Sequence, residues 1–174
     1  MRLFVVCLLG LFAACGEAPP TPTGDVRIGT GARDGRPGFV PFAPGAQLEL
    51  APGAQGGFHV FVNLELPAGA ESLYTDRPLI RRVARRTADG VLVSRTTRRE
   101  ALATGATDTL QTPSSLLLFL CPTPLGISVA EEELELEVEV RHPSGAPSAS
   151  GATRFVPICP DGPQASFCRS ICYG

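Results

Sequence analysis

Hydrophobic and polar residues alternate along several short stretches of this chain, and this alternation predicts β-strands. The clearest stretch covers residues 131–141 (EEELELEVEVR), where leucines and valines alternate with glutamates. Residues 58–66 (FHVFVNLEL) follow the same period, with valines and leucines on one face and His59 on the other. Alternation of this kind is typical of strands with one face in the core and one in solvent, so we expect His59 on the solvent side.

Weaker patterns complete the series of expected strands. The dipeptide Asp89-Gly90 separates two extended runs and predicts a hairpin with a two-residue type I′ turn. Residues 115–121 (SLLLFLC) are continuously apolar, which predicts a strand buried on both faces. Residues 142–151 (HPSGAPSASG) read as a flexible hairpin loop. The other expected strands are residues 26–30, 39–42, 47–51, 79–88, 91–97 and 152–159.

This spacing of strands predicts an all-β fold, namely an antiparallel β-sandwich with an immunoglobulin-like architecture. The chain of 174 residues contains 19 Gly and 17 Pro, which favour turns and disfavour helices, and no stretch predicts a helix. It contains no Trp and no Cys in the early strands, so it lacks the immunoglobulin fingerprint. We expect residues 25–174 to form a single domain.

The N-terminus has the features of an export signal. After Met1-Arg2, an apolar run covers residues 3–14, which is shorter than the roughly 20 residues of a spanning helix. Residues 1–14 therefore predict a signal peptide. The run ends in Ala13-Ala14-Cys15-Gly16, which resembles the bacterial lipobox, although Phe12 stands where that pattern usually has Leu. The resemblance implies that Cys15 is lipidated and becomes the mature N-terminus.

Two further expectations follow from this N-terminus. In a Gram-negative host, the resemblance implies that Gly16 after the acylated Cys directs the protein to the outer membrane, where the lipid would be the membrane attachment. Residues 15–24 would then form the lipidated Cys and a Pro-rich tether (GEAPPTPTG). Together with the string QGGFHV at residues 55–60 and the Cys-Pro pairs that end two strands, these features resemble short predicted lipoproteins of GC-rich deltaproteobacteria. No activity is known for that group, and the resemblance implies a place in the cell envelope.

The cysteine count agrees with lipidation. Cys7 lies in the signal peptide and Cys15 would carry lipid, which leaves an even number for disulfides in an oxidising compartment. The four candidates allow three pairings, of which we favour Cys121–Cys159 and Cys168–Cys172. One alternative is a redox-active pair, although the three residues between Cys168 and Cys172 do not match the Cys-x-x-Cys motif. Another is a zinc site formed by these thiols and His142.

The chain contains 15 arginines and no lysine, as expected of a GC-rich genome. The formal net charge of −2 excludes a strongly basic nucleic-acid binder. A cluster of arginines between residues 77 and 99 could bind lipopolysaccharide or another polyanion, because a guanidinium group matches phosphate in a bidentate way. Its candidate residues are Arg81, Arg82, Arg85, Arg86, Arg95, Arg98 and Arg99. The alternative is a charge-paired sheet surface in which the Glu133–Glu139 row neutralises the arginines. Counting back from Asp89-Gly90 places Arg81 opposite Arg98, an unfavourable pair unless acidic residues lie beside it.

No motif predicts catalysis, a cofactor or a metal site. The chain has two histidines and no GxSxG motif, so a catalytic triad cannot be assembled. The glutamate row could be a glycosidase pair or a calcium site, but its regular period is typical of a solvated sheet face. We therefore expect a non-enzymatic module that binds a partner or has a structural role. An envelope hydrolase that uses His59 with neighbouring carboxylates is the alternative.

Overall fold

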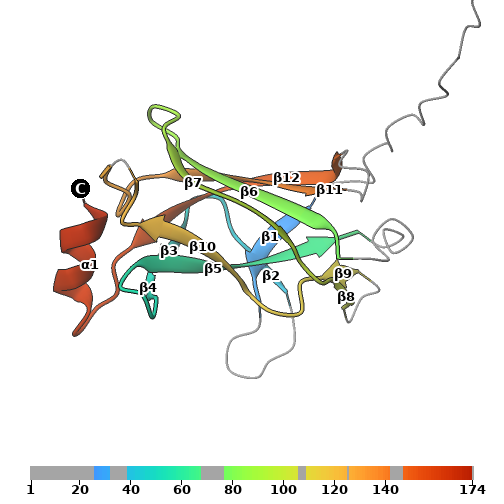
Figure 1. Ribbon diagram of the computed structural model, residues 1–174, viewed down its shortest axis with the longest axis horizontal. Helices are drawn as coiled ribbons and strands as arrows, with labels where there is room; N and C mark the ends of the chain where they lie inside the picture. Colours follow the sequence, from blue (N-terminus) through green and yellow to red (C-terminus); the bar gives the residue numbers. More distant parts are fainter. Residues whose placement is uncertain are drawn as a thin grey trace, which may run out of the picture.

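The computed structural model describes residues 26–31, 39–67, 77–105, 109–124, 126–141 and 147–173. These segments form two β-sheets that pack face to face, with one helix at the end of the sandwich (Figure 1). The expected all-β sandwich is confirmed. The expected signal peptide, Cys15 and the Pro-rich tether lie outside the described residues.

The first sheet has five strands in the order β3-β12-β11-β6-β7. All neighbours are antiparallel except β12 and β3, which are parallel, so this sheet is mixed. The β11–β12 and β11–β6 pairs form its centre. The strand bounds are β3 Ala46–Glu49, β12 Pro147–Ile158, β11 Leu134–Arg141, β6 Leu79–Arg86 and β7 Leu92–Arg99.

The second sheet is built around the long strand β5 (Phe58–Leu66). The first half of β5 pairs with β10 and β4, and its second half pairs with β1 and β9. Two short strands, β2 and β8, extend the sheet beyond β1 and β9. The other bounds are β1 Arg27–Thr30, β2 Val40–Pro41, β4 Ala51–Pro52, β8 Ala103–Thr104, β9 Leu110–Gln111 and β10 Leu116–Cys121.

The core lies between the sheets and consists of the alternating apolar residues that the sequence pattern identifies. On β11, Leu134, Leu136, Val138 and Val140 are buried, while the intervening residues are half-buried or exposed. The apolar face of β5 is buried opposite them. Each such side chain stabilises the fold by roughly 1.5–3 kcal/mol relative to an exposed position.

The prediction that residues 115–121 are buried on both faces is wrong. In β10, Leu117 and Phe119 have exposed fractions of 44% and 46%, whereas Leu116, Leu118 and Leu120 are buried. The buried and exposed residues of β10 alternate because one face of the strand is turned toward the core and the other toward solvent.

The predicted hairpin between β6 and β7 is confirmed, but its turn differs. A four-residue connection closes the hairpin: the Arg86 amide donates to the Val91 oxygen, and the Gly90 amide donates to the Arg86 oxygen. Gly90 alone has a positive φ, of 70°, which excludes a type I′ turn. A bulge between Ala84 and Arg85 then shifts the register by one residue. Arg81 consequently lies opposite Thr97, and the predicted Arg81–Arg98 pair is wrong.

The C-terminal third contains two further differences from the sequence prediction. Residues 147–151 belong to β12 and are not part of a loop, while residues 142–146 lie outside the described part of the chain. A Cβ on Gly151 would collide with the main-chain oxygen of Val26, so glycine allows the two segments to approach closely. The tail also forms a helix, α1 (Ala165–Cys172), which the sequence analysis did not predict.

Candidate functional site

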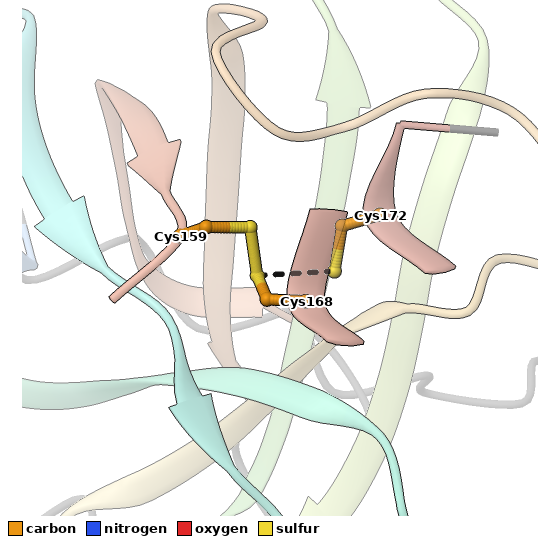
Figure 2. A group of neighbouring side chains, drawn as sticks. All are labelled: Cys159, Cys168 and Cys172. Atoms are coloured by element: carbon orange, nitrogen blue, oxygen red, sulfur yellow. Dashed lines mark hydrogen bonds between the residues drawn. A yellow bond between two sulfur atoms is a disulfide. The ribbon is translucent and has the colours of Figure 1, made fainter. Parts of the chain in front are cut away.

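Two adjacent disulfides join helix α1 to the sandwich and bring their sulfur atoms together in one cluster. Cys121 at the end of β10 pairs with Cys172, and Cys159, which follows β12, pairs with Cys168. The Sγ atoms of Cys159, Cys168 and Cys172 all lie within 4.8 Å of one another (Figure 2). The two disulfides approach closely, with 3.8 Å between Cys168 Sγ and Cys172 Sγ.

Helix α1 positions this cluster because it carries one cysteine of each disulfide, four residues apart and therefore on one helical face. Both helical cysteines are fully buried. The main-chain oxygen of Cys172 accepts hydrogen bonds from the amides of Val129 and Ala130, at 2.8 and 3.1 Å. The cluster thus fixes the helix to both sheets and to the loop before β11.

All four predicted cysteines form disulfides, but the favoured pairing is wrong. Cysteines separated by four residues in a regular helix point the same way without bringing their Cβ atoms to the roughly 3.5–4.5 Å that a disulfide needs. The i, i+4 spacing of Cys168 and Cys172 is the sequence signal that would have excluded this pair, had the helix been predicted. The zinc alternative would require reduction of both disulfides, and His142 lies outside the described residues.

The predicted glutamate row lies beside the arginine hairpin, as the charge-paired alternative requires. Strand β11 pairs with β6 so that Glu139 is opposite Arg81 and Glu135 is opposite Arg85. Glu139 binds Arg81 at 2.9 Å and Arg141 at 2.7 Å. On the other side of the row, Glu135 accepts a hydrogen bond from Arg154 at 2.8 Å. The hydrogen bonds from Arg141 and Arg81 lower the pKa of Glu139 below its ordinary value, against the effect of burial.

This pairing divides the predicted polyanion-binding arginines into two groups. On β6, Arg81 is paired with Glu139, Arg86 with Asp89 at 2.6 Å, and Arg85 donates to the main-chain oxygen of Gly90. On β7, Arg95, Arg98 and Arg99 are exposed and have no carboxylate partner among the described residues. Within the predicted cluster, the exposed arginines without a carboxylate partner among the described residues are therefore those of the edge strand β7 and Arg85, which donates to Gly90.

Arg82 is buried and cannot contribute to a surface patch. Its exposed fraction is 2%, because it faces the interior of the sandwich opposite Val138. Arg82 Nη1 donates to the main-chain oxygen of Leu117 at 3.2 Å, and Arg82 Nη2 lies 3.9 Å from Glu100. Burial lowers its pKa below the ordinary value, and Glu100 opposes that shift. The prediction that Arg82 belongs to an anion-binding surface is thus wrong.

His59 is not on the solvent side, which corrects the sequence prediction. Its exposed fraction is 5%, and its ring contacts Phe61 at 4.9 Å and Phe119 at 5.6 Å between centroids. Neither ring nitrogen has a hydrogen-bond partner among the described residues. Burial lowers the pKa of His59. The described structure therefore places aromatic rings around His59 and no carboxylate in hydrogen-bond contact with it.

The polar residues of β5 that the pattern assigned to solvent are also buried, and they join neighbouring segments. Asn63 accepts hydrogen bonds from Gly31 and Ser115 and donates to Thr112. Glu65 pairs with Arg27 and accepts a hydrogen bond from Gln111 at 2.7 Å. A cavity of about 420 Å³ lies beside Asn63 and Gln111. Because these side chains satisfy one another, the network stabilises the second sheet.

Comparisons with known proteins place no constraint on the site: no protein family, curated protein or solved structure matches the chain. The described residues contain no helix long and apolar enough to cross a membrane. The predicted lipidation site, Cys15, lies outside the described residues.

Proposed function

We propose that this protein is a lipid-anchored module of the bacterial cell envelope that acts by binding a partner or as a structural component, without catalysis. The observation that carries the proposal is the motif Ala13-Ala14-Cys15-Gly16 directly after a twelve-residue apolar run. Two disulfides in a domain of modest size support it, because disulfides persist in oxidising compartments outside the cytoplasm. The outer membrane is the destination that Gly16 favours.

The anchor is tested by separating membrane and soluble fractions of bacteria that express the full chain. The protein should sediment with membranes and be released by detergent but not by high salt, since acyl chains hold it through apolar contact. Cys15→Ala should move it to the soluble fraction, whereas the matched control Cys7→Ala should leave it with the membrane. A Cys15→Ala protein that still resists extraction by salt would contradict the proposal.

A second candidate function, polyanion binding, is favoured by the arginines of β7. Arg95 and Arg99 are four residues apart on the same side of the strand, which at about 3.4 Å per residue places their Cα atoms roughly 13 Å apart. Arg77 lies beside Arg99, since Arg77 and Arg99 each donate a hydrogen bond to the other's main-chain oxygen. Guanidinium groups bind phosphate in a bidentate way, so lipopolysaccharide or an anionic lipid surface is the suitable partner.

This second function predicts salt-sensitive binding to lipopolysaccharide or to vesicles that contain anionic lipid. The triple variant Arg95→Gln/Arg98→Gln/Arg99→Gln should abolish most of that binding. A matched control with the same change in net charge is Arg85→Gln/Arg154→Gln/Arg169→Gln, which removes exposed arginines elsewhere on the surface. Equal losses in the two variants would contradict a site on β7.

A further inference from the structure

Three apolar side chains are exposed next to one another on the outer face of the second sheet, where β10 lies beside β5 (Figure 1). Phe61 is opposite Leu117 and His59 is opposite Phe119, so these residues share the face that points away from the core. The exposed fractions of Phe61, Leu117 and Phe119 are 37%, 44% and 46%, and the rings of Phe61 and Phe119 cover His59. We call the three exposed residues the apolar patch. A contiguous patch, unlike isolated exposed side chains, indicates an interaction surface.

A cationic side chain lies beside the apolar patch. A groove of about 230 Å³ separates β7 from β10, and its lining includes Arg98, Leu117 and Phe119. Arg98 is opposite the core residue Ile80, so its side chain leaves β7 on the side that faces the second sheet. Arg98 is exposed and has no carboxylate partner in the part of the chain that the structure describes. Its guanidinium is therefore available to an anion at the edge of the apolar patch.

The charges around the groove favour an anionic partner. The charged residues that line it are Arg82, Arg98 and Glu100, so positive charge is in excess. Burial lowers the pKa of Arg82, Glu100 opposes that shift, and the nearby charge of Arg98 lowers the pKa further. An anion beside Arg98 would offset this repulsion between the two guanidinium groups. On the other side of the apolar patch, Phe61 lines a second cavity together with Glu49, so the side at β10 is the one that suits an anionic surface.

The predicted lipid anchor is close enough for this face to reach a bilayer. Residues 16–25 separate Cys15 from the first described residue, and an extended chain of ten residues spans at most about 35 Å. Arg27, at the start of β1, is opposite Glu65, which is four residues from Phe61 on β5, or about 14 Å along the strand. The chain between the lipid and β1 is thus long enough for the second sheet to lie against the membrane.

We propose that the outer face of the second sheet docks on the anionic bilayer that holds the lipid of Cys15, with the apolar patch among the lipid headgroups and Arg98 bound to a lipid phosphate. Apolar contact and attraction to anionic lipid act together in such interfacial binding. This inference rests on the lipid anchor and adds the orientation of the anchored domain. It differs from a polyanion site along β7, because Arg95 and Arg99 project from the opposite side of that strand.

Tryptophan fluorescence of the lipidated protein in vesicles tests this docking. The native chain contains no Trp, so Phe119→Trp adds a single reporter and keeps an aromatic ring in the apolar patch. The mature protein is purified in detergent, reconstituted into phosphatidylglycerol vesicles with brominated acyl chains, and floated before measurement. The reporter should lose about half of its fluorescence relative to vesicles without bromine, because bromine quenches a Trp that is inserted among the lipids.

Leu92→Trp is the matched control for this reporter. Leu92 has a similar exposed fraction, 40%, but lies opposite Arg85 on the outer face of the first sheet, so its fluorescence should be retained. In the Phe119→Trp protein, Arg98→Gln should reduce the quenching about twofold, as should high salt, since both weaken attraction to phosphate. Arg95→Gln, on the other side of β7, should leave the quenching unchanged.

The same experiment separates failure of the docking from failure of the anchor. Floated protein whose Phe119→Trp reporter is not quenched, or is quenched no more than Leu92→Trp, would overturn the docking and leave the anchor intact. Equal effects of Arg98→Gln and Arg95→Gln would overturn the contact between Arg98 and phosphate. Protein that does not float with the vesicles would contradict the anchor and, with it, the docking that depends on it.

Discussion

Arg82 on β6 donates a hydrogen bond to the main-chain oxygen of Leu117 on β10, at 3.2 Å, and so joins the two sheets at an edge of the sandwich. Leu117 belongs to a strand that pairs with β5 alone among the described strands, which leaves its other main-chain edge without a neighbouring strand. Glu100 lies 3.9 Å from the same guanidinium. The buried charge of Arg82 is thereby stabilised where the edges of β7 and β10 meet.

Replacement of this arginine should destabilise the fold strongly. Arg82→Ala removes the donor to Leu117, which costs about 1–3 kcal/mol for an unsatisfied buried group, and it leaves a cavity as well. We therefore expect the free energy of unfolding to fall by about 3 kcal/mol in a urea titration. Arg85→Ala, at an exposed position on the same strand, should change it by less than about 0.5 kcal/mol. Similar losses in the two variants would contradict the bridging role of Arg82.

The two disulfides should contribute unequally to stability. The Cys121–Cys172 bond spans 51 residues and the Cys159–Cys168 bond spans 9. The chain-entropy relation gives about 4 kcal/mol for the longer loop and about 2.5 kcal/mol for the shorter one. Cys121→Ser/Cys172→Ser should therefore lower the thermal midpoint more than Cys159→Ser/Cys168→Ser, as measured by calorimetry. The reverse order would contradict the pairing described above.

The stability of the protein should decrease when the pH falls below about 6.5, because of His59. Burial lowers the pKa of His59 in the folded chain, so the unfolded chain takes up a proton at a higher pH than the folded chain does. The free energy of unfolding is thus unaffected by this group above about pH 6.5 and declines below it. Urea titrations at pH 7.5 and at pH 5.5 measure the difference.

His59→Phe is the control for this pH dependence, because it preserves a ring between Phe61 and Phe119 and removes the titrating group. The decline between pH 7.5 and pH 5.5 should be smaller in the variant than in the native chain. A decline of the same size would show that other groups cause it.

The charge pairs on the outer face of β11 should contribute little. Glu139 is half-buried between Arg81 and Arg141, and Glu139→Gln should reduce the free energy of unfolding by about 0.5 kcal/mol at neutral pH and less at high salt. Hydrogen bonds from these arginines lower the pKa of Glu139 in the folded chain. The carboxylate therefore stabilises the fold fully at pH values above its ordinary pKa of 4.5, and this contribution is lost as the pH falls through the lowered, folded-state pKa. The variant should therefore lose less stability on acidification than the native chain, which a pH series of urea titrations measures.

The sequence predicted those parts of the fold that local periodicity determines. The alternation in residues 58–66 and 131–141 identified strands β5 and β11 and their buried faces, because a strand with one apolar face has a period of two. The same alternation predicts that the glutamates of β11 share one face, and this face lies beside the arginines of β6 because the two strands are neighbours in one sheet. It could not indicate that His59 is covered, since the aromatic rings that cover it come partly from β10.

The parts that were predicted wrongly depend on contacts between distant segments. Burial of Arg82 depends on the edge of β10, and the position of β3 depends on parallel pairing with β12, about a hundred residues away. Helix α1 is short and is held by its two disulfides, so its sequence carries no strong helical signal. The four-residue connection and the bulge between Ala84 and Arg85 together altered the register of the hairpin by one residue, and such a shift changes every cross-strand pair.

The central claim, that the mature protein is anchored to a membrane by lipid on its first residue, is tested most directly by the mass of its N-terminal peptide. The protein should be purified in detergent from the envelope of the cells that express it, and digested before mass spectrometry. We predict a peptide that begins at Cys15 and carries the added mass of acyl chains. A peptide that begins elsewhere, or that contains an unmodified Cys15, would contradict the proposed anchor.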